Sequence, residues 1–151
     1  MSEVLVVVEA TDRGWHRTGL EAVGAGATAA ASLKLPLTAA CLTPRAEQWA
    51  DNVPAGPERL LAAGCEWLGT YTADGYSAAL HELVQQRRPR LVVLPHTYQV
   101  RDYAPRAATR SGAALISDII ELRTGDGGAL TSVRQLFQGK LNAEIVLTGD
   151  G

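Results

Sequence analysis

The sequence predicts a three-layer α/β fold: a parallel sheet with helices on both faces, followed by a C-terminal antiparallel meander. Up to Gly112, short apolar runs alternate with segments of helical periodicity, which implies parallel strands joined by right-handed crossovers. Two of these runs, Val4–Val8 and residues 91–94, are continuously apolar, as is typical of strands covered on both faces. Beyond Gly112 the alternation stops, and extended segments separated by glycines follow.

The first strand is predicted over Val4–Val8 and the first helix after it. Thr18 and Glu21 have the spacing of a capping box, in which the threonine hydroxyl accepts from one free amide and the glutamate reaches back to another. We expect this helix to run to about Leu33, because Pro36 follows. The residues expected on its inner face, near a 3.6-residue spacing, are Leu20, Val23, Ala27 and Ala30 or Ala31.

The middle of the chain gives weaker signals. A second strand is predicted over residues 37–42 and is followed by irregular chain. Pro57 suits the first turn of a short helix, and Gly64 suits its left-handed end. We expect a weak third strand over residues 66–70.

The next helix has the clearest periodicity in the chain, and Pro89 ends it. Its apolar positions are Tyr76, Ala79, Leu80, Leu83 and Val84. The fourth strand is predicted over residues 91–94. Asp102 is the expected N-cap of the helix after it, with Pro105 tolerated in the first turn and Gly112 at the end.

The last part of the chain predicts three antiparallel strands added to the parallel core. They are expected over residues 119–123, 129–137 and 140–148, separated by the turn-forming cluster 124–128 and by Gln138-Gly139. No internal repeat or low-complexity linker interrupts the sequence. We therefore expect residues 1–151 to form a single α/β domain.

Composition excludes several classes of function. The chain has 14 Lys and Arg against 16 Asp and Glu, which lacks the basic excess of a nucleic-acid binder. Cys41 and Cys65 form no C-x-x-C pair, so zinc and thioredoxin-like chemistry lack support. No secretory signal is visible, and the apolar runs fall well short of the roughly 20 residues of a membrane span. We expect a cytoplasmic, bacterial protein without membrane insertion.

Ligands in open α/β sheets bind at the carboxyl ends of neighbouring strands where strand order reverses. The first and fourth strands should meet there, so residues 9–17 and 95–101 are the loops that matter. A phosphate cradle needs glycines, but Gly14 is the one glycine in these two loops. His96 could act as an acid or base, yet no Ser, Cys or ligand set is spaced around it. We therefore predict no catalytic, cofactor-binding or metal-binding residue.

Charged residues near this crevice and in the meander are candidates for contacts with other molecules. Arg101, Asp102 and Arg106 form the densest charged set, and Arg134 lies in a predicted meander strand. Arg is favoured for bidentate pairing with anions or across a domain boundary. The structural alternative for the first three is an N-cap with an internal ion pair, and the sequence does not decide between the two.

A set of residues in the last third of the chain carries a resemblance to a known family. Its parts are the Arg-Asp-Tyr-Ala-Pro-Arg run of residues 101–106, then Gly112, Ser117-Asp118, Arg134 and Gly139. In this order the chain resembles the N-terminal domain of the electron transfer flavoprotein alpha subunit, over nearly its whole length. Val100 stands where that family usually has Gly, Gln135 where it has Pro, and Gln138 where it has the first Gly of a pair.

The resemblance implies a Rossmann-like (adenine-nucleotide-hydrolase-like) fold and a division of labour between domains. In that family FAD sits on the C-terminal domain, which this sequence lacks, and the alpha subunit pairs with a beta subunit. Electrons pass through the complex from dehydrogenases to an acceptor. The implied role is a scaffold and subunit-contact domain without FAD of its own, with Arg101, Asp102, Arg106 and Arg134 as contact candidates.

Two other functions remain open at this point. The first alternative is a stand-alone nucleotide-binding module of the universal-stress type, which would use the same crevice. That family places a G-x-x-G after the fourth strand, where this chain has residues 95–100 without glycine. The second alternative is a hydrolase using His96 or Ser117.

Overall fold

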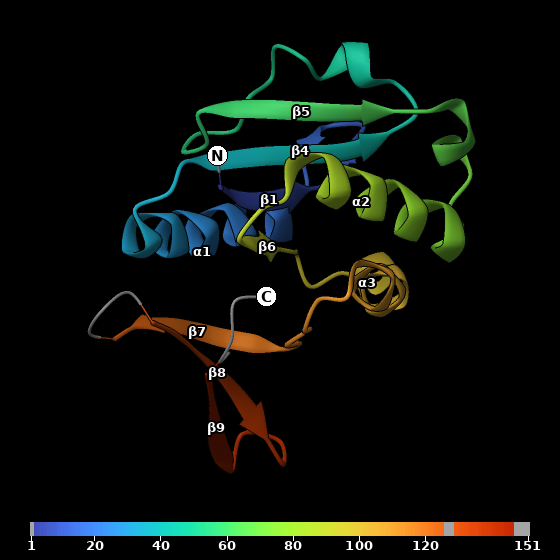
Figure 1. Ribbon diagram of the computed structural model, residues 1–151. Helices are drawn as coiled ribbons and strands as arrows, with labels where there is room; N and C mark the ends of the chain where they lie inside the picture. Colours follow the sequence, from blue (N-terminus) through green and yellow to red (C-terminus); the bar gives the residue numbers. More distant parts are fainter. Residues whose placement is uncertain (1, 126–128, 147–151) are drawn as a thin grey trace.

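The computed structural model describes residues 2–125 and 129–146. Its core is a four-stranded parallel sheet, as the sequence predicts (Figure 1). The strands, in spatial order, are β5 (Arg59–Gly64), β4 (Leu37–Thr43), β1 (Val4–Val8) and β6 (Leu91–Val93). The first and fourth predicted strands, β1 and β6, are therefore neighbours.

Helices cover both faces of this sheet. Helix α1 (Arg17–Leu33) packs on the face formed by alternate β1 residues such as Val6. Helices α2 (Ala73–Arg87) and α3 (Tyr98–Ser111) pack on the opposite face, where Val7 and the buried Tyr103 meet. Because successive strand side chains point to opposite faces, the continuous apolar run of β1 supplies both cores.

Strand β6 differs from β1 although both runs are wholly apolar. Every residue of β1 is buried, whereas those of β6 are half-buried. The difference follows from position, because β6 pairs with β1 on one side and is an edge strand of the described sheet. The prediction that this run is covered on both faces is thus only partly correct.

The antiparallel meander also forms as predicted. Its strands are β7 (Ile119–Thr124), β8 (Leu130–Leu136) and β9 (Leu141–Val146), in that spatial order. It lies beyond the β6 edge of the parallel sheet, with β7 packed against α1 (Figure 1). The predicted turn at 126–128 and the predicted strand residues 147–148 lie outside the described residues.

Charged side chains complete the packing of the meander. Arg123 forms ion pairs with Glu121 on its own strand and with Glu144 on β9. In the register of the sheet Val133 lies opposite both glutamates, and it is only 1% exposed. Long charged side chains can cover apolar surface while their heads remain in water, so this network shields Val133.

The start of α1 corrects one prediction. The N-cap is His16, whose ring Nδ1 accepts from the backbone N–H of Thr18, so Thr18 and Glu21 form no capping box. Glu21 instead pairs with Arg17 one turn earlier, at 3.1 Å. The predicted inner face is also shifted: Val23 and Ala30 are buried, but Leu20 is exposed. The small residues Gly19, Ala22, Gly26 and Ala29 form the rest of the buried face.

Two predicted elements in the middle of the chain are wrong. The segment predicted as a helix from Pro57 to Gly64 is the strand β5, paired along its length with β4. The segment predicted as a strand over residues 66–70 is the short 3₁₀ helix η2 (Glu66–Gly69). Pairing with a buried neighbouring strand outweighs the helix propensity of Leu and Ala in β5. A second 3₁₀ turn, η1 (Ala46–Gln48), lies between β4 and β5.

The cap of α3 is also different from the prediction. Thr97 is the N-cap, with its hydroxyl accepting from the N–H of Val100, and Asp102 lies inside the helix. The predicted end is correct, because Gly112 has a left-handed φ of 66° and its N–H closes the last turn. A small hairpin of β2 (Ala10–Thr11) and β3 (Gly14–Trp15) leads from β1 into α1.

The amino ends of the parallel strands are joined by a buried ion cluster. Glu3, directly before β1, is 1% exposed and accepts from Arg87 at 2.8 Å and from Arg59 at 3.1 Å. The hydroxyl of Thr38 at the start of β4 also donates to Glu3. One carboxylate thus links β1, β4, β5 and the end of α2. Among the described residues, no helix is long and apolar enough to span a membrane.

Candidate functional site

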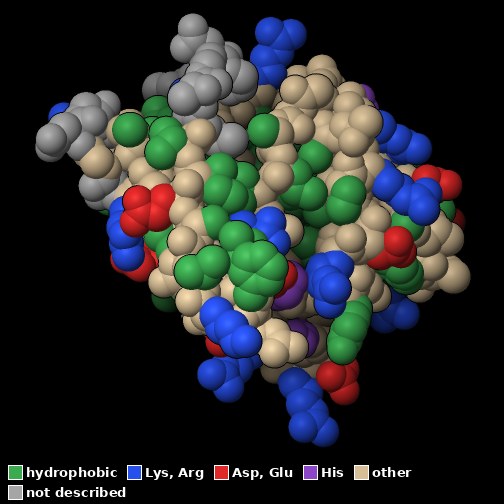
Figure 2. Space-filling view, turned by 90° about the horizontal axis from the view of Figure 1, so that it is seen from below, with side chains coloured by type: hydrophobic (Ala, Val, Ile, Leu, Met, Phe, Trp, Pro, Cys, Tyr) green, Lys and Arg blue, Asp and Glu red, His purple; other side chains and the backbone are tan. Residues whose placement is uncertain are grey.

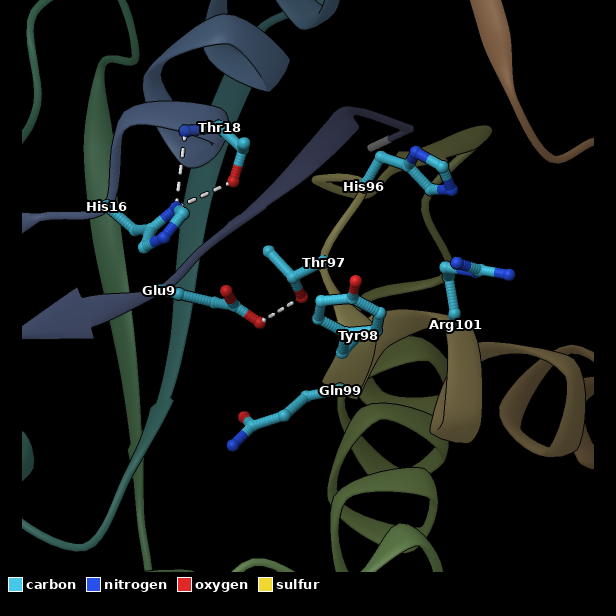
Figure 3. A pocket seen from close by; sticks show the side chains of 8 residues that line it. All are labelled: Glu9, His16, Thr18, His96, Thr97, Tyr98, Gln99 and Arg101. Atoms are coloured by element: carbon cyan, nitrogen blue, oxygen red, sulfur yellow. Dashed lines mark hydrogen bonds between the residues drawn. The ribbon is translucent and has the colours of Figure 1, made fainter.

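The carboxyl ends of β1 and β6 border an open crevice of about 540 Å³ (Figure 3). It lies where the sequence predicted it, between the loops that follow these two strands. Its lining residues are Glu9, His16, Thr18, His96, Thr97, Tyr98, Gln99 and Arg101. Neither glycine nor cysteine is among them.

Glu9 and Thr97 form the link across this crevice. The Thr97 hydroxyl donates to Glu9 Oε1 at 2.9 Å while it accepts from the Val100 N–H at 3.2 Å (Figure 3). The carboxylate therefore sits beside the amino terminus of α3, the position at which a helix dipole favours negative charge. A phosphate placed there would meet the Glu9 carboxylate, so the chain itself supplies the anion that complements this helix.

The amino terminus of α1 is satisfied in a similar way. His16 caps the helix, and its Nδ1 lies 3.3 Å from the Thr18 nitrogen and 2.7 Å from the Thr18 hydroxyl. Both helices that open onto the crevice are thus capped by side chains of this chain. This arrangement differs from a phosphate cradle, in which free backbone N–H groups close on the ligand.

His96 reaches the crevice as predicted, and its ring Nε2 lies 3.1 Å from Asp118 Oδ1. Both side chains are about half exposed, and Asp118 adopts a left-handed φ of 57°. Within residues 2–125 and 129–146, His96 makes no hydrogen bond to a hydroxyl or thiol that could serve as its nucleophile partner. The same described residues contain no group of three His, Cys, Asp or Glu arranged to hold a metal ion.

Arg101 and Tyr98 are exposed side chains in the first turns of α3. Tyr98 is 88% exposed, and Arg101 forms no ion pair with another described residue. Arg101 points out of the crevice on the side of His96 (Figure 3). Among the four predicted contact candidates, Arg101 is therefore one whose guanidinium is accessible to another molecule.

Asp102 and Arg106 are joined to α2 and the loop before it. The Tyr71 hydroxyl donates to Asp102 Oδ2 at 2.8 Å, and Arg106 pairs with Asp74 at 2.9 Å. Arg110 reaches the same carboxylate at 3.6 Å. Burial and the hydrogen bond to Asp102 raise the pKa of Tyr71 to about 12. The structural alternative from the sequence is therefore only partly matched: Arg106 has an ion pair within the chain, but with Asp74, and the N-cap is Thr97, not Asp102.

Arg134 lies on β8 of the meander, whereas the other three candidates lie on helix α3. It is opposite Ile119 of β7 and Ala143 of β9. Its Nε is buried and has no hydrogen-bond partner among the described residues. Buried hydrogen-bond donors are nearly always paired in native proteins. The Nε–H of Arg134 is thus a donor that no described residue uses.

Sequence reasoning missed the contribution of Glu9 and Thr97 to the crevice. Two signals could have indicated it. Glu9 is the first polar residue after a fully apolar strand, and Thr97 stands three residues before Val100, the spacing of a threonine N-cap. Their pairing across 88 positions could not be read from either signal alone.

Comparison with known proteins gives a family match for the chain. The profile described as "Electron transfer flavoprotein domain" matches residues 4–151, nearly the whole chain. The chain belongs to the electron transfer flavoprotein family. The resemblance predicted from the sequence is thereby confirmed, and the Rossmann-like parallel sheet is consistent with it.

Curated relatives include alpha subunits of electron transfer flavoproteins. The chain is 32% identical to "Electron transfer flavoprotein subunit alpha" of Clostridium acetobutylicum, over 95% of this chain and 43% of the relative. It is 31% identical to "Protein FixB" of Clostridium saccharobutylicum, over 94% and 43% respectively. Identity to the alpha subunit of Mycobacterium tuberculosis H37Rv is 28%, over 99% and 45%. The chain thus spans less than half the length of these relatives.

Proposed function

We propose that this chain is the N-terminal domain of an electron transfer flavoprotein alpha subunit and acts through protein contacts. In this proposal it forms a single domain, residues 1–151, on which an FAD-bearing domain and a beta subunit rest. The complete heterodimer carries electrons from dehydrogenases to an acceptor, and this part of it catalyses no reaction. The observation that carries the proposal is the family match over residues 4–151.

The chemistry of the crevice supports the absence of a cofactor on this domain. The Glu9 carboxylate, bonded through Thr97, already complements the amino terminus of α3. His16 caps α1 in the same crevice. A phosphate or pyrophosphate group would have to displace these contacts, which argues for FAD bound elsewhere and against the universal-stress-like nucleotide module.

The contact candidates fit a role in assembly to different degrees. Arg101 is exposed and has no ionic partner among the described residues, and Arg134 has an unsatisfied buried Nε. We propose these two as contacts with the beta subunit or with the FAD domain. Asp102 and Arg106 remain candidates through their exposed surfaces, in addition to their internal bonds to Tyr71 and Asp74.

The proposal also covers the cellular compartment of the complex and its partners. The relatives named above are bacterial, and we propose a cytoplasmic complex with no nucleic-acid partner. The balance of 14 basic and 16 acidic side chains supports the exclusion of nucleic acid.

Flavin and nucleotide titrations test the proposal directly. We expect the purified 151-residue chain to be colourless and to bind neither FAD nor AMP tightly by calorimetry. We expect it to associate with an electron transfer flavoprotein beta subunit from the same organism, measured by co-purification with tagged beta subunit. Stoichiometric FAD on the isolated chain would refute the assignment of the cofactor to another domain. Tight AMP or ATP binding without beta-subunit association would favour the nucleotide module instead.

A further inference from the structure

The cap of helix α1 is a histidine bond that forms in one protonation state. The Nδ1 of His16 lies 3.3 Å from the Thr18 nitrogen and 2.7 Å from the Thr18 hydroxyl oxygen (Figure 3). A backbone N–H can only donate, so Nδ1 accepts and carries no proton. The capping form of His16 is therefore the neutral ring, with its proton on Nε2.

A second acceptor for the His16 ring lies on the strand opposite. The hairpin register pairs Ala10 with Trp15, and the His16 N–H donates to the Glu9 carbonyl at 2.8 Å. Glu9 and His16 are thus the next opposite pair along the two strands. Side chains opposite each other on antiparallel strands share one face, with Cβ atoms about 4.5–5.5 Å apart. Rotation of the His16 side chain therefore brings its ring to the Glu9 carboxylate.

The Glu9 carboxylate has no cationic partner in the structure. It accepts one hydrogen bond, from the Thr97 hydroxyl at 2.9 Å, and forms no ion pair with another described residue. Glu9 and His16 both line the crevice between β1 and β6. A cation formed at His16 thus has an uncompensated carboxylate beside it.

We propose that His16 is a pH-dependent latch on the crevice. The neutral ring caps α1, and the protonated ring leaves Thr18 and pairs with the Glu9 carboxylate. Histidine changes charge between about pH 5 and pH 8, so the latch works in the physiological range. It uses residues of this chain alone and does not depend on the proposed function.

Protonation changes three interactions of His16 in the same direction. Nδ1 becomes a donor and can no longer accept from the Thr18 N–H. The ring lies at the amino terminus of α1, where the helix dipole disfavours a positive charge. The Glu9 carboxylate attracts the charged ring. The Thr18 hydroxyl can accept from the protonated Nδ1, but a hydrogen bond from a cation to a carboxylate is roughly twice as strong as a neutral one.

The other charged groups near His16 leave Glu9 as its partner. The charged and titratable residues on the surrounding elements are Glu9, Asp12, Arg13, Arg17, Glu21, His96, Tyr98, Arg101 and Asp118. Among the acids, Glu21 and Asp118 are each in an ion pair with another residue. Asp12 lies in the turn of the hairpin, beyond its paired positions. Glu9 is therefore the acid that lies directly opposite His16.

Movement of the latch changes the charge that the crevice presents. With His16 neutral, the Glu9 carboxylate is uncompensated. With His16 bound to Glu9, that charge is balanced, while Arg101 remains accessible on the facing wall. Figure 2 shows histidine side chains that reach the surface near Lys and Arg side chains, and His16 is itself exposed to solvent. The crevice therefore becomes more positive as the pH falls, and the first turn of α1 loses its cap.

Nitrogen-15 NMR of the histidine rings in the 151-residue chain tests the latch. At about pH 8 we expect His16 to carry a proton on Nε2 and none on Nδ1, and at about pH 5.5 a proton on both. Because the Thr18 amide loses its acceptor, its protection factor against hydrogen exchange should be about fivefold lower at the acidic pH. Nuclear Overhauser contacts between the His16 ring and the Glu9 side chain should appear at the acidic pH alone.

Three substitutions separate His16 from the other titrating groups. His16→Asn keeps a good N-cap and cannot titrate, so the protection of the Thr18 amide should not change with pH. His96→Asn removes the other histidine of the crevice and should leave the change in place. Glu9→Gln removes the attracting charge and should abolish the contacts between residues 9 and 16. Circular dichroism confirms that each variant is folded.

Several outcomes would overturn the inference. A proton on His16 Nδ1 at about pH 8 is incompatible with the cap. A protonated ring that keeps its contacts with Thr18, or Thr18 protection that is the same at both pH values, would refute the movement. A pH response that persists in His16→Asn would assign it to another group. The ring measurements use the unchanged chain, so they decide the matter even if a variant fails to fold, and FAD and beta-subunit binding test the proposed function separately.

Discussion

The two ends of the parallel sheet use charged residues in opposite ways. At the amino end, the carboxylate of Glu3 is 1% exposed and bonded to Arg59, Arg87 and Thr38. At the carboxyl end, Glu9 makes one bond to Thr97 and lines an open crevice with His96 and Arg101. The amino end is built as a closed structural cluster, and the carboxyl end has charges accessible to other molecules.

Glu3 therefore contributes mainly to the stability of the sheet, whereas Glu9 contributes mainly to the surface of the crevice. Glu3 links the starts of three strands and the end of a helix, so its loss affects the whole sheet. Glu9 affects the start of one helix. Experiments that remove each set of bonds should therefore give effects of different size.

Replacing Glu3 should produce the largest loss of stability. Glu3→Ala removes a buried carboxylate, leaves Arg87 and Arg59 without their shared partner, and creates a small cavity. We expect the free energy of unfolding to fall by about 3 kcal/mol, near the lower limit for breaking a buried pair, because both arginines can still reach water. Urea denaturation followed by circular dichroism measures this.

Glu21→Ala is the matched control for that measurement. Glu21 also pairs with an arginine, at 3.1 Å, but both side chains are largely exposed. An exposed pair one helical turn apart contributes about 0.3–0.5 kcal/mol. Equal effects of the two substitutions would contradict the view of Glu3 as the centre of a structural cluster.

The same carboxylate should make stability depend on pH at the acidic end. Burial alone would raise the pKa of Glu3, but the bonds from Arg87, Thr38 and Arg59 together hold this pKa below its usual range. A group with a lowered pKa stabilises the fold above the pKa of its unfolded form, about 4.3, and this contribution is lost as pH falls through the folded-state pKa.

Comparing urea midpoints of the wild-type chain and Glu3→Gln at several pH values isolates this contribution. The glutamine variant cannot titrate at this position, so the difference between the two proteins should be greatest near neutral pH. It should shrink as the pH is lowered below about 4. A difference that stays constant down to strongly acidic pH would show that the charge of Glu3 is not the source of its effect.

The parallel core was predictable because its strands carry their own signal. Val4–Val8 and Leu37–Thr43 are apolar along most of their length. Such runs are typical of strands that are buried on both faces. Strand β5 reads Arg-Leu-Leu-Ala-Ala-Gly, whose Leu and Ala favour a helix. Its pairing with β4 decides its conformation, and that partner lies outside any local window.

The candidate site was likewise predictable from the sequence only in part. His96 and Arg101 could be placed at the crevice because they follow a recognisable strand. The bond between Glu9 and Thr97 joins residues 88 positions apart. It depends on the exact placement of the loops after β1 and β6, which are neighbouring strands. The position of the meander beside the sheet, with β7 packed against α1, likewise has no signal in residue spacing.

A smaller effect is expected at the carboxyl end, from Thr97→Ala. The substitution removes the N-cap of α3 and the bond to Glu9, and the loss of such a cap costs about 1 kcal/mol. Thermal denaturation measures the change. Thr97→Ser keeps the hydroxyl and should remain close to wild type. A loss as large as that of Glu3→Ala would remove the distinction between the two ends of the sheet.

The smallest expected effect concerns the link between Tyr71 and Asp102. Burial, followed by the bond to Asp102, raises the pKa of Tyr71 to about 12. Asp102→Asn removes the negative charge, so the pKa of Tyr71 should fall towards its ordinary value of about 10 while stability changes by less than about 1 kcal/mol. Ultraviolet titration of the phenol measures the pKa, with Tyr71→Phe identifying its signal among the four tyrosines. An unchanged titration in Asp102→Asn would mean that Asp102 is not held by Tyr71 in solution and is available to a partner protein.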